Sequence, residues 1–212
     1  MTKVKICGIS RLEDISYVNK LLPDYIGLVF ASSKRQVIIS QAKDLIKALD
    51  KNVKTVGVFV NEDCDKVRSI SKLLKLDILQ FHGNEDEEYI KNFNDFTIWK
   101  SLSINIVIEK KIIDNQKKID NINNFAIDAI LLDSYIKGTN GGSGKSFDWS
   151  IIENLNIRKN IILAGGLNLE NITKAINMVK PCCVDISSGV ESNGIKSFEK
   201  MKKFINKVRL LK

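Results

Sequence analysis

Four side chains able to transfer protons or bind anions each follow a short apolar run of this 212-residue sequence: Cys7, Arg35, His82 and Asp133. A thiolate can act as a general base, and a protonated carboxyl group can act as a general acid. A guanidinium group pairs with a carboxylate through two parallel hydrogen bonds. The set therefore indicates acid–base chemistry on an anionic substrate. Each residue also has a purely structural alternative. Cys7 could be a buried apolar side chain and Asp133 a helix cap. Arg35 could be a solvated surface cation, and His82 could hydrogen-bond a loop to the backbone.

The surroundings should tune the two proton-transfer groups in opposite directions. Nearby cations such as Lys5 or Arg35 would lower the pKa of the Cys7 thiol and favour the thiolate. Asp133 ends the apolar run AILLD, where desolvation would raise the carboxyl pKa and keep the group protonated. We therefore expect a base at Cys7 and an acid at Asp133.

Small residues follow two later runs, as Gly165-Gly166 and Ser187-Ser188. Glycine lets the backbone approach a ligand closely, and several convergent backbone N–H groups bind a phosphate. A helix opening near Asn168 would add its free N–H groups to the same place. The two pairs together predict a phosphate site. The alternative is a pair of ordinary strand-to-helix turns.

The stretch GTNGGSGKS at 138–146 is similar to a nucleotide-binding P-loop but departs from it. The P-loop needs a glycine five residues before its Gly-Lys-Ser, and Thr139 stands there. We expect no nucleotide at this loop.

Composition narrows the classes of protein. The chain is 44% apolar and 27% charged, with a net charge of +8, and no apolar run reaches the ~18 residues of a membrane span. It has four cysteines, no CxxC pair and one histidine, which argues against a zinc site and for reduced thiols. The lysines are scattered along the chain, so we expect no nucleic-acid partner and no membrane partner. A cytoplasmic protein that is a monomer or homodimer is expected.

The chemistry-bearing residues must be positioned by a repeating pattern of strands and helices. Short β-branched runs recur at residues 4–8, 25–30, 54–60, 76–83, 96–102, 128–134, 160–166 and 183–189. Helical segments follow them, for example over 40–49 with Ser40 as N-cap, over 171–180 and after Phe198, whereas 105–120 has only a loose apolar stripe.

Eight strands alternating with eight helices predict a parallel sheet, either open and doubly wound or closed as a (β/α)8 barrel. Eight similar units in 212 residues favour the barrel, as a single domain over residues 1–212. In such a barrel the carboxyl ends of the strands form the active site. The residues singled out above would then meet at one rim.

At this point the strand ends resemble a known family, the phosphoribosylanthranilate isomerases. The matching segments fall in order from residue 3 to about residue 198 and include KICGIS at 5–10, VGVFVN at 56–61, LQFHG at 79–83, LLDS and GGSGKSFDW within 131–149, LAGGLN at 163–168 and VDISSGVES at 184–192. Departures from the family pattern include FASSKR before Arg35, Phe81, Ser143 and Trp99. None of them removes a catalytic group.

The resemblance implies a (β/α)8 enzyme of tryptophan biosynthesis that needs no metal or cofactor. Its reaction is an Amadori rearrangement of phosphoribosylanthranilate, with the family's base at Cys7 and its acid at Asp133. It implies that Arg35 binds the anthranilate carboxylate. His82 is a candidate for substrate binding, with a hydrogen bond between its loop and the backbone as the alternative. The implied phosphate grip comprises Gly144, Gly165, Gly166, Ser187 and Ser188, with Gly144 on a flexible loop over the site.

Two alternatives remain at this stage. One is the histidine-pathway isomerase of a related aminosugar, which has an aspartate where this chain has Cys7. The other is a barrel that binds phosphorylated metabolites without catalysis, against which the presence of both Cys7 and Asp133 argues.

Overall fold

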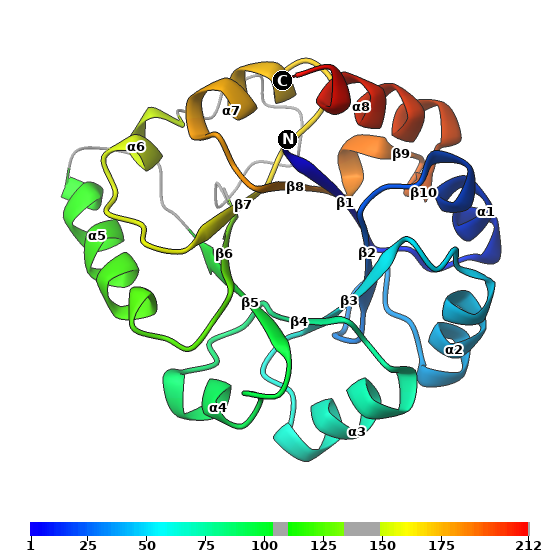
Figure 1. Cartoon of the computed structure of the whole chain (residues 1–212), viewed down its shortest axis with the longest axis horizontal. Coiled ribbons are helices and arrows are strands. Elements are labelled where there is room, and N and C mark those ends of the chain that lie inside the picture. Colours follow the sequence, from blue (N-terminus) through cyan, green and yellow to red (C-terminus); the bar gives the residue numbers. More distant parts are fainter. Residues whose placement is uncertain (104–109, 134–148, 212) are drawn as a thin grey trace.

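Eight parallel strands close into a barrel surrounded by helices in the computed structural model, which describes residues 1–103, 110–133 and 149–211 (Figure 1). Each strand pairs with the next along the chain, and β8 pairs with β1. The strands are β1 (Lys3–Cys7), β2 (Tyr25–Val29), β3 (Lys54–Phe59), β4 (Ile78–Phe81), β5 (Thr97–Ser103), β6 (Ala129–Asp133), β7 (Asn160–Ala164) and β8 (Cys183–Ile186). The predicted closed barrel is confirmed, and the open sheet is excluded.

The helices form the outer ring of Figure 1. They are α1 (Leu12–Leu21), α2 (Ile39–Ala48), α3 (Cys64–Leu74), α4 (Glu87–Lys91), α5 (Lys110–Asn123), α6 (Ser150–Glu153), α7 (Ile172–Val179) and α8 (Phe198–Leu210). The predicted cap at Ser40 is wrong: α2 begins earlier, and its cap position is Ile38, which makes no side-chain cap hydrogen bond. The helix predicted over 171–180 is confirmed as α7, and the residues spaced along one face of it, Ile172, Ala175, Ile176 and Val179, are all buried.

Alternate residues of the strands separate into two apolar clusters, because successive side chains of a strand point to opposite faces. Residues such as Val4, Ile26 and Leu163 pack outward against the helices. The second cluster fills the lower barrel interior and consists of Tyr25, Val56, Ile78, Trp99, Ala129, Leu131, Ile162, Ala164 and Cys183. The core therefore lies both inside the barrel and between barrel and helices.

A short hairpin after β8 was not predicted. Ser188–Val190 form one turn of 3₁₀ helix, and β9 (Glu191–Ser192) then pairs antiparallel with β10 (Ile195–Lys196). Asn193 and Gly194 between the strands have φ values of 52° and 78°. Positive φ at both central positions defines the type I′ turn that Asn-Gly favours, so the chain turns sharply and brings the hairpin back beside β1 (Figure 1).

The cysteines behave as the sequence predicts. Cys7, Cys64, Cys182 and Cys183 are all free thiols, and the adjacent pair alternates as strand geometry requires, with Cys182 exposed and Cys183 buried. No cluster of three or more metal-binding side chains occurs within residues 1–103, 110–133 and 149–211. No helix in the same ranges is long and apolar enough to span a membrane.

Trp99 should be a major stabilising residue that has no part in catalysis. It is 5% exposed, and its ring meets that of Tyr25 edge-on at a centroid distance of 5.0 Å. Trp99→Ala would leave a cavity and cost about 3–5 kcal/mol of unfolding free energy, measured by urea denaturation. The exposed Leu73→Ala, as control, should change it by less than about 0.5 kcal/mol. An unchanged urea midpoint for Trp99→Ala would contradict this packing role.

Candidate active site

A cavity of 320 Å³ lies at the carboxyl ends of the barrel strands. Eight of the predicted site residues line it: Cys7, Arg35, His82, Asp133, Gly165, Gly166, Ser187 and Ser188. The ninth, Gly144, lies outside the described residues. Asp185, Gln80 and Ser33 also line the cavity. The topology thus gathers at one place residues that are up to 181 positions apart in the sequence.

Cys7 lies at the end of β1 beside a buried ion pair. Lys5 is fully buried, and its Nζ lies 2.7 Å from Oδ2 of Asp185 on β8. Burial raises the pKa of the Cys7 thiol, and the Lys5 ammonium, which contacts the thiol, lowers it only in part. The net pKa of Cys7 is therefore above its ordinary value. This corrects the expectation of a lowered pKa, because the desolvation exceeds the effect of the cation.

The ion pair between Lys5 and Asp185 stabilises the charged form of Lys5. Burial alone would lower the pKa of Lys5, but the charges of Asp185 and Cys7 outweigh it, so that the pKa is raised. Oδ1 of Asp185 is buried and has no hydrogen-bond partner among the residues that the structure describes. Lys5 is thus a fixed cation below the thiol, and Asp185 offers one acceptor to the cavity.

Gly27 makes room for this arrangement. A Cβ at this position would lie 2.7 Å from Sγ of Cys7 and 3.2 Å from Cε of Lys5. Only a residue without a side chain lets β2 pass so close to both groups. The glycine in the run YIGLVF is therefore part of the site, although nothing in its sequence context marks it.

Asp133 lies at the end of β6 and faces His82. The His82 Nε2 lies 3.3 Å from Oδ2 of Asp133, and the His82 Nδ1 lies 3.1 Å from Nε2 of Gln80. The Asp133 side chain is 26% exposed, so the burial of the AILLD run stops short of its carboxyl group. Within the described residues, the His82 ring contacts the side chains of Gln80, Ser101 and Asp133, and it therefore lies beside the candidate acid.

Two turns after β7 and β8 form the small-residue side of the cavity. Gly165 and Gly166 have φ values of 78° and 61°, a region that glycine enters without strain. Asn171 fixes the first turn by donating its side-chain amide to the Gly166 carbonyl oxygen at 2.9 Å. A Cβ at Gly189 would overlap the Leu167 carbonyl oxygen, so the two turns pack directly on each other.

Ser187 uses its side chain differently from the prediction for a phosphate ligand. Its hydroxyl donates to the carbonyl oxygen of Cys7 at 3.0 Å and accepts from Nζ of Lys196 at 3.2 Å. The hydroxyl thus connects the β8 turn to the end of β1. Because the hydroxyl is engaged in these contacts, the backbone of Ser187 would be the part that binds a phosphate.

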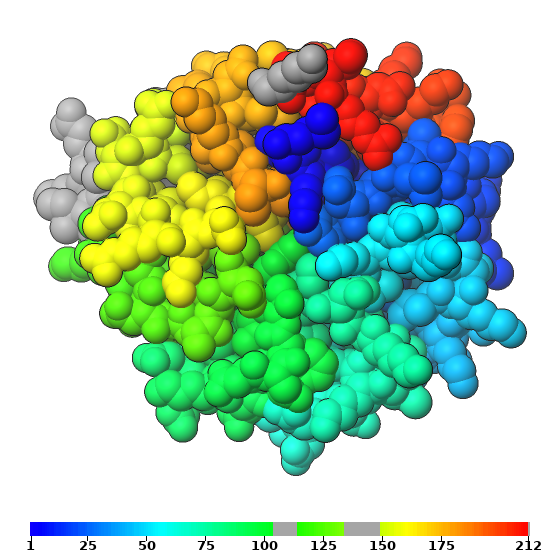
Figure 2. Space-filling view, in the orientation of Figure 1, coloured from blue at the N-terminus to red at the C-terminus, as the bar shows by residue number. Residues whose placement is uncertain are grey.

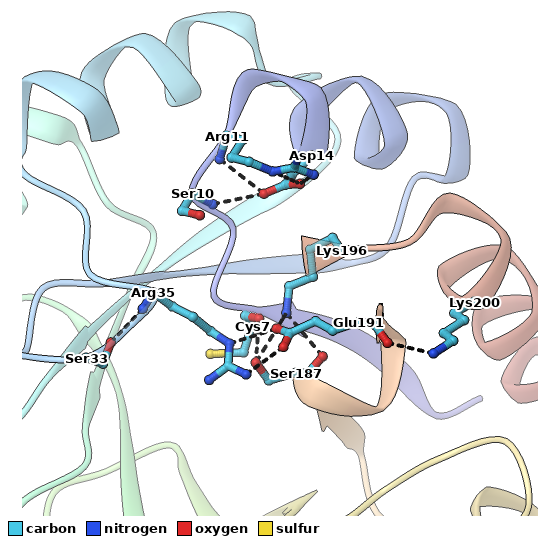
Figure 3. A network of polar contacts seen from close by, with 10 residues as sticks. All are labelled: Cys7, Ser10, Arg11, Asp14, Ser33, Arg35, Ser187, Glu191, Lys196 and Lys200. Atoms are coloured by element: carbon cyan, nitrogen blue, oxygen red, sulfur yellow. Dashed lines mark hydrogen bonds and ion pairs between the residues drawn. The ribbon is translucent and has the colours of Figure 1, made fainter. Parts of the chain in front are cut away.

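Arg35 is held by Glu191, which also binds Lys196, and the sequence analysis missed both of these residues. Its Nε and Nη2 donate to Oε1 and Oε2 of Glu191, each at 2.7 Å, and Nζ of Lys196 donates to the same Oε1 at 2.6 Å (Figure 3). Burial raises the pKa of Glu191, but hydrogen bonds from Arg35 and Lys196 outweigh it and hold the pKa below its ordinary value. The Asn-Gly turn at 193–194 was the sequence signal for this hairpin.

A larger hollow of 670 Å³ lies at the opposite end of the barrel. Tyr25, Trp99 and Cys182 are among its lining residues. Figure 2 shows this face, with the first residues, in dark blue, near its centre. None of the candidate catalytic residues lines this hollow. Size alone therefore does not identify the active site. In a barrel of this kind the carboxyl ends of the strands carry the chemistry.

Known proteins are similar to this chain over their whole lengths. Residues 4–207 match the family model of N-(5'phosphoribosyl)anthranilate (PRA) isomerase. The N-(5'-phosphoribosyl)anthranilate isomerase of Clostridium kluyveri is 50% identical over 212 residues, which cover 100% of both chains.

Solved structures agree. The phosphoribosyl anthranilate isomerase of Thermotoga maritima has a TM-score of 0.83 and 34% identity, covering 100% of both chains. A phosphoribosyl anthranilate isomerase in complex with reduced 1-(o-carboxyphenylamino)-1-deoxyribulose 5-phosphate has a TM-score of 0.80 and 32% identity, again over 100% of both chains. The chain therefore belongs to the N-(5'-phosphoribosyl)anthranilate isomerase family and is an isomerase.

Proposed function

We propose that this chain converts N-(5'-phosphoribosyl)anthranilate to 1-(2-carboxyphenylamino)-1-deoxyribulose 5-phosphate in tryptophan biosynthesis, with Asp133 as general acid and Cys7 as general base. The observation that carries the assignment is one cavity lined by a thiol, a carboxyl group, a guanidinium group and two glycine- and serine-rich turns. The substrate needs a proton donor, a proton acceptor, a carboxylate partner and a phosphate site. The cavity offers one group for each.

Asp133 opens the sugar ring. The carboxyl group protonates the ring oxygen, the bond between this oxygen and C1 breaks, and the nitrogen lone pair forms the C1=N bond of a Schiff base. His82, whose Nε2 lies 3.3 Å from Oδ2 of Asp133, orients the acid. Asp185, whose Oδ1 has no hydrogen-bond partner within residues 1–103, 110–133 and 149–211, is an acceptor for a sugar hydroxyl.

Cys7 completes the rearrangement. Its thiolate removes the proton from C2, and the electrons of the C–H bond form the C1=C2 bond of an enol amine as the C1=N electrons return to nitrogen. Transfer of a proton from the 2-hydroxyl group to C1 then gives the ketone. The fixed cation of Lys5, which opposes the effect of burial on the thiol pKa, keeps the thiolate accessible.

The remaining residues would bind the two ends of the substrate. The Arg35 guanidinium, at one side of the cavity, suits the anthranilate carboxylate. The backbone of the turns at 165–166 and 187–188 suits the phosphate, and Gly144, outside the described residues, is the further phosphate contact expected from the sequence. This division places the reacting C1 and C2 atoms between Cys7 and Asp133.

Removing either proton-transfer group should abolish most of the activity. Cys7→Ala and Asp133→Asn should each lower kcat by about 10²- to 10⁴-fold, because each removes one proton-transfer step. The assay follows the loss of anthranilate fluorescence with freshly made substrate and no added metal. Cys182→Ala, at the opposite end of the barrel, is the matched control and should keep wild-type kcat. Full activity in both active-site variants would refute the mechanism.

Lys5 should set the pH dependence through Cys7. The base acts as a thiolate, so activity should rise with pH as Cys7 ionises. Lys5→Met removes the cation that lowers the Cys7 pKa and leaves the Asp185 charge that raises it. The rising limb of the kcat/KM profile should therefore move to higher pH.

The ionisation itself can be measured by the pH dependence of iodoacetamide labelling of Cys7 in a Cys64→Ser, Cys182→Ser background. The labelling midpoint should rise in Lys5→Met and return part of the way when Asp185→Asn is added, since both charges are then absent. An unshifted midpoint in Lys5→Met would show that the ion pair does not tune the thiol.

A further inference from the structure

Glu191 and Lys196 lie on a hairpin that carries no part of the proton-transfer machinery, yet both are buried. Glu191 binds Arg35 and Lys196 binds Ser187, two residues that line the cavity. Glu191 is 9% exposed and Lys196 is 4% exposed. A buried charge is costly unless it is paired, and these two are paired with each other and with Arg35. An apolar hairpin would close this side of the barrel without the cost of burying charges. The charges therefore call for a functional explanation.

We propose that Glu191 and Lys196 are positioning residues that orient the Arg35 guanidinium for the substrate carboxylate. The inference rests on the carboxylate role proposed above for Arg35. Glu191 fixes the plane of the guanidinium, and Lys196 neutralises the charge of Glu191 so that the carboxylate is not repelled.

The hydrogen bonds leave the right donors unoccupied. A guanidinium group has five N–H donors, and Glu191 takes one from Nε and one from Nη2. Nη1 has no hydrogen-bond partner within the part of the chain that the structure describes. The Nη1–Nη2 edge therefore remains available as a second two-pronged fork, directed by the first one. One arginine can in this way bridge the protein carboxylate and a ligand carboxylate.

The second support of Arg35 is the backbone of Gly8, directly after β1. Gly8 has a φ of 78°, and a Cβ there would overlap Cδ of Arg35. The aliphatic part of the arginine thus lies flat on Gly8, while its head is held by Glu191. Two contacts on opposite parts of one side chain remove most of its freedom before ligand binding, which lowers the entropy cost of recognition.

The group formed by Arg35, Glu191 and Lys196 has a net charge that attracts an anionic ligand only because Lys196 is part of it. Arg35 and Glu191 alone sum to zero, and a ligand carboxylate would meet the Glu191 charge at close range. Lys196, 2.6 Å from Oε1 of Glu191, makes the group of three net positive. Burial lowers the pKa of Lys196, and the Glu191 carboxylate opposes this effect.

Lys196 also connects this group to the centre of the site. It donates to the carbonyl oxygen of Ser187 at 3.1 Å, and the Ser187 hydroxyl donates to the carbonyl oxygen of Cys7. In Figure 3 the side chains of Arg35, Glu191 and Lys196 converge beside Cys7 and Ser187. The hairpin therefore fixes the distance between the carboxylate-binding group and the catalytic thiol.

Two ligands that differ only in the carboxylate test the proposal. One is reduced 1-(o-carboxyphenylamino)-1-deoxyribulose 5-phosphate, and the other is the same compound without its carboxyl group. Their dissociation constants are measured by calorimetry for the wild type and for Glu191→Gln, Lys196→Met, Arg35→Met and the double variant Arg35→Met/Glu191→Gln.

Glu191→Gln and Lys196→Met should each weaken binding of the carboxylate ligand by about 10- to 100-fold, since a guanidinium displaced by about 1 Å loses its alignment. Binding of the ligand without the carboxylate should change less than about twofold. In the Arg35→Met background the Glu191→Gln change should have no further effect, because it acts through Arg35. In steady-state assays KM should rise more than kcat falls.

Lys200→Met is the matched control. Nζ of Lys200, in the first turn of α8, donates to the backbone oxygen of Glu191 rather than to its carboxylate, so the loss of this neighbouring charge should leave both affinities unchanged. Thermal unfolding of every variant checks that it folds. If Glu191→Gln is too unstable to measure, Glu191→Asp takes its place. This variant keeps the charge and should retain part of the discrimination between the two ligands.

The outcomes separate the inference from the function on which it rests. If Arg35→Met keeps full discrimination between the ligands, the carboxylate role of Arg35 fails, and the inference fails with it. If Arg35→Met loses the discrimination but Glu191→Gln keeps it, or if Glu191→Gln weakens both ligands equally, only the inference is overturned.

Discussion

The pairing of β1 with β8 is the contact on which the rest of this molecule depends. Lys3, Val4, Lys5 and Ile6 pair with residues 183–186, some 180 positions away in the sequence. Closing so long a loop has a substantial entropy cost, which the apolar clusters of all eight strands must offset together. Without this closure, Lys5 loses Asp185, Cys7 loses Ser187 and Arg35 loses Glu191. The active site is therefore a consequence of barrel closure rather than of any single loop.

Stability and chemistry are divided between the two ends of the barrel interior. Near the amino ends of the strands the interior is apolar, with Tyr25, Trp99 and Ile162 in one cluster. At the carboxyl ends the same alternation places Asp185, Gln80 and Asp133 toward the cavity. Buried charges contribute little net stability, so the apolar end must supply what the catalytic end lacks. Separate ends let one be optimised without disturbing the other.

The sequence predicted most of the fold because its signal is local and repeated. Each β-branched run ends within three residues of an observed strand end, and the chain order of the runs leaves few topologies. Cys7 and Asp133 were identifiable for the same reason: each is a reactive residue at the end of an apolar run. Boundaries that depend on tertiary packing were less accurate, as at the start of α2, where Ile38 rather than Ser40 occupies the cap position.

Glu191 and Lys196 could not be assigned from the sequence, because their importance lies in a contact between residues 156 positions apart. The Asn-Gly pair at 193–194 predicts a hairpin, but nothing local shows that its charges point toward Arg35. The predicted direction of the Cys7 pKa shift was wrong for a related reason. The cation at Lys5 is visible in the sequence, whereas the burial that outweighs it appears only when β2 passes over the thiol at Gly27.

The balance at Cys7 has a chemical logic. A thiol of raised pKa gives a stronger base once it is ionised, and removing a proton from carbon benefits from a strong base. If burial acted alone, too few molecules would hold the thiolate. Lys5 limits the rise, and since it is itself held by Asp185 it does so without entering the cavity. Burial makes the Cys7 thiolate a stronger base, and the ion pair keeps enough of the thiol ionised. The two effects shift the pKa in opposite directions, yet both serve the same reaction.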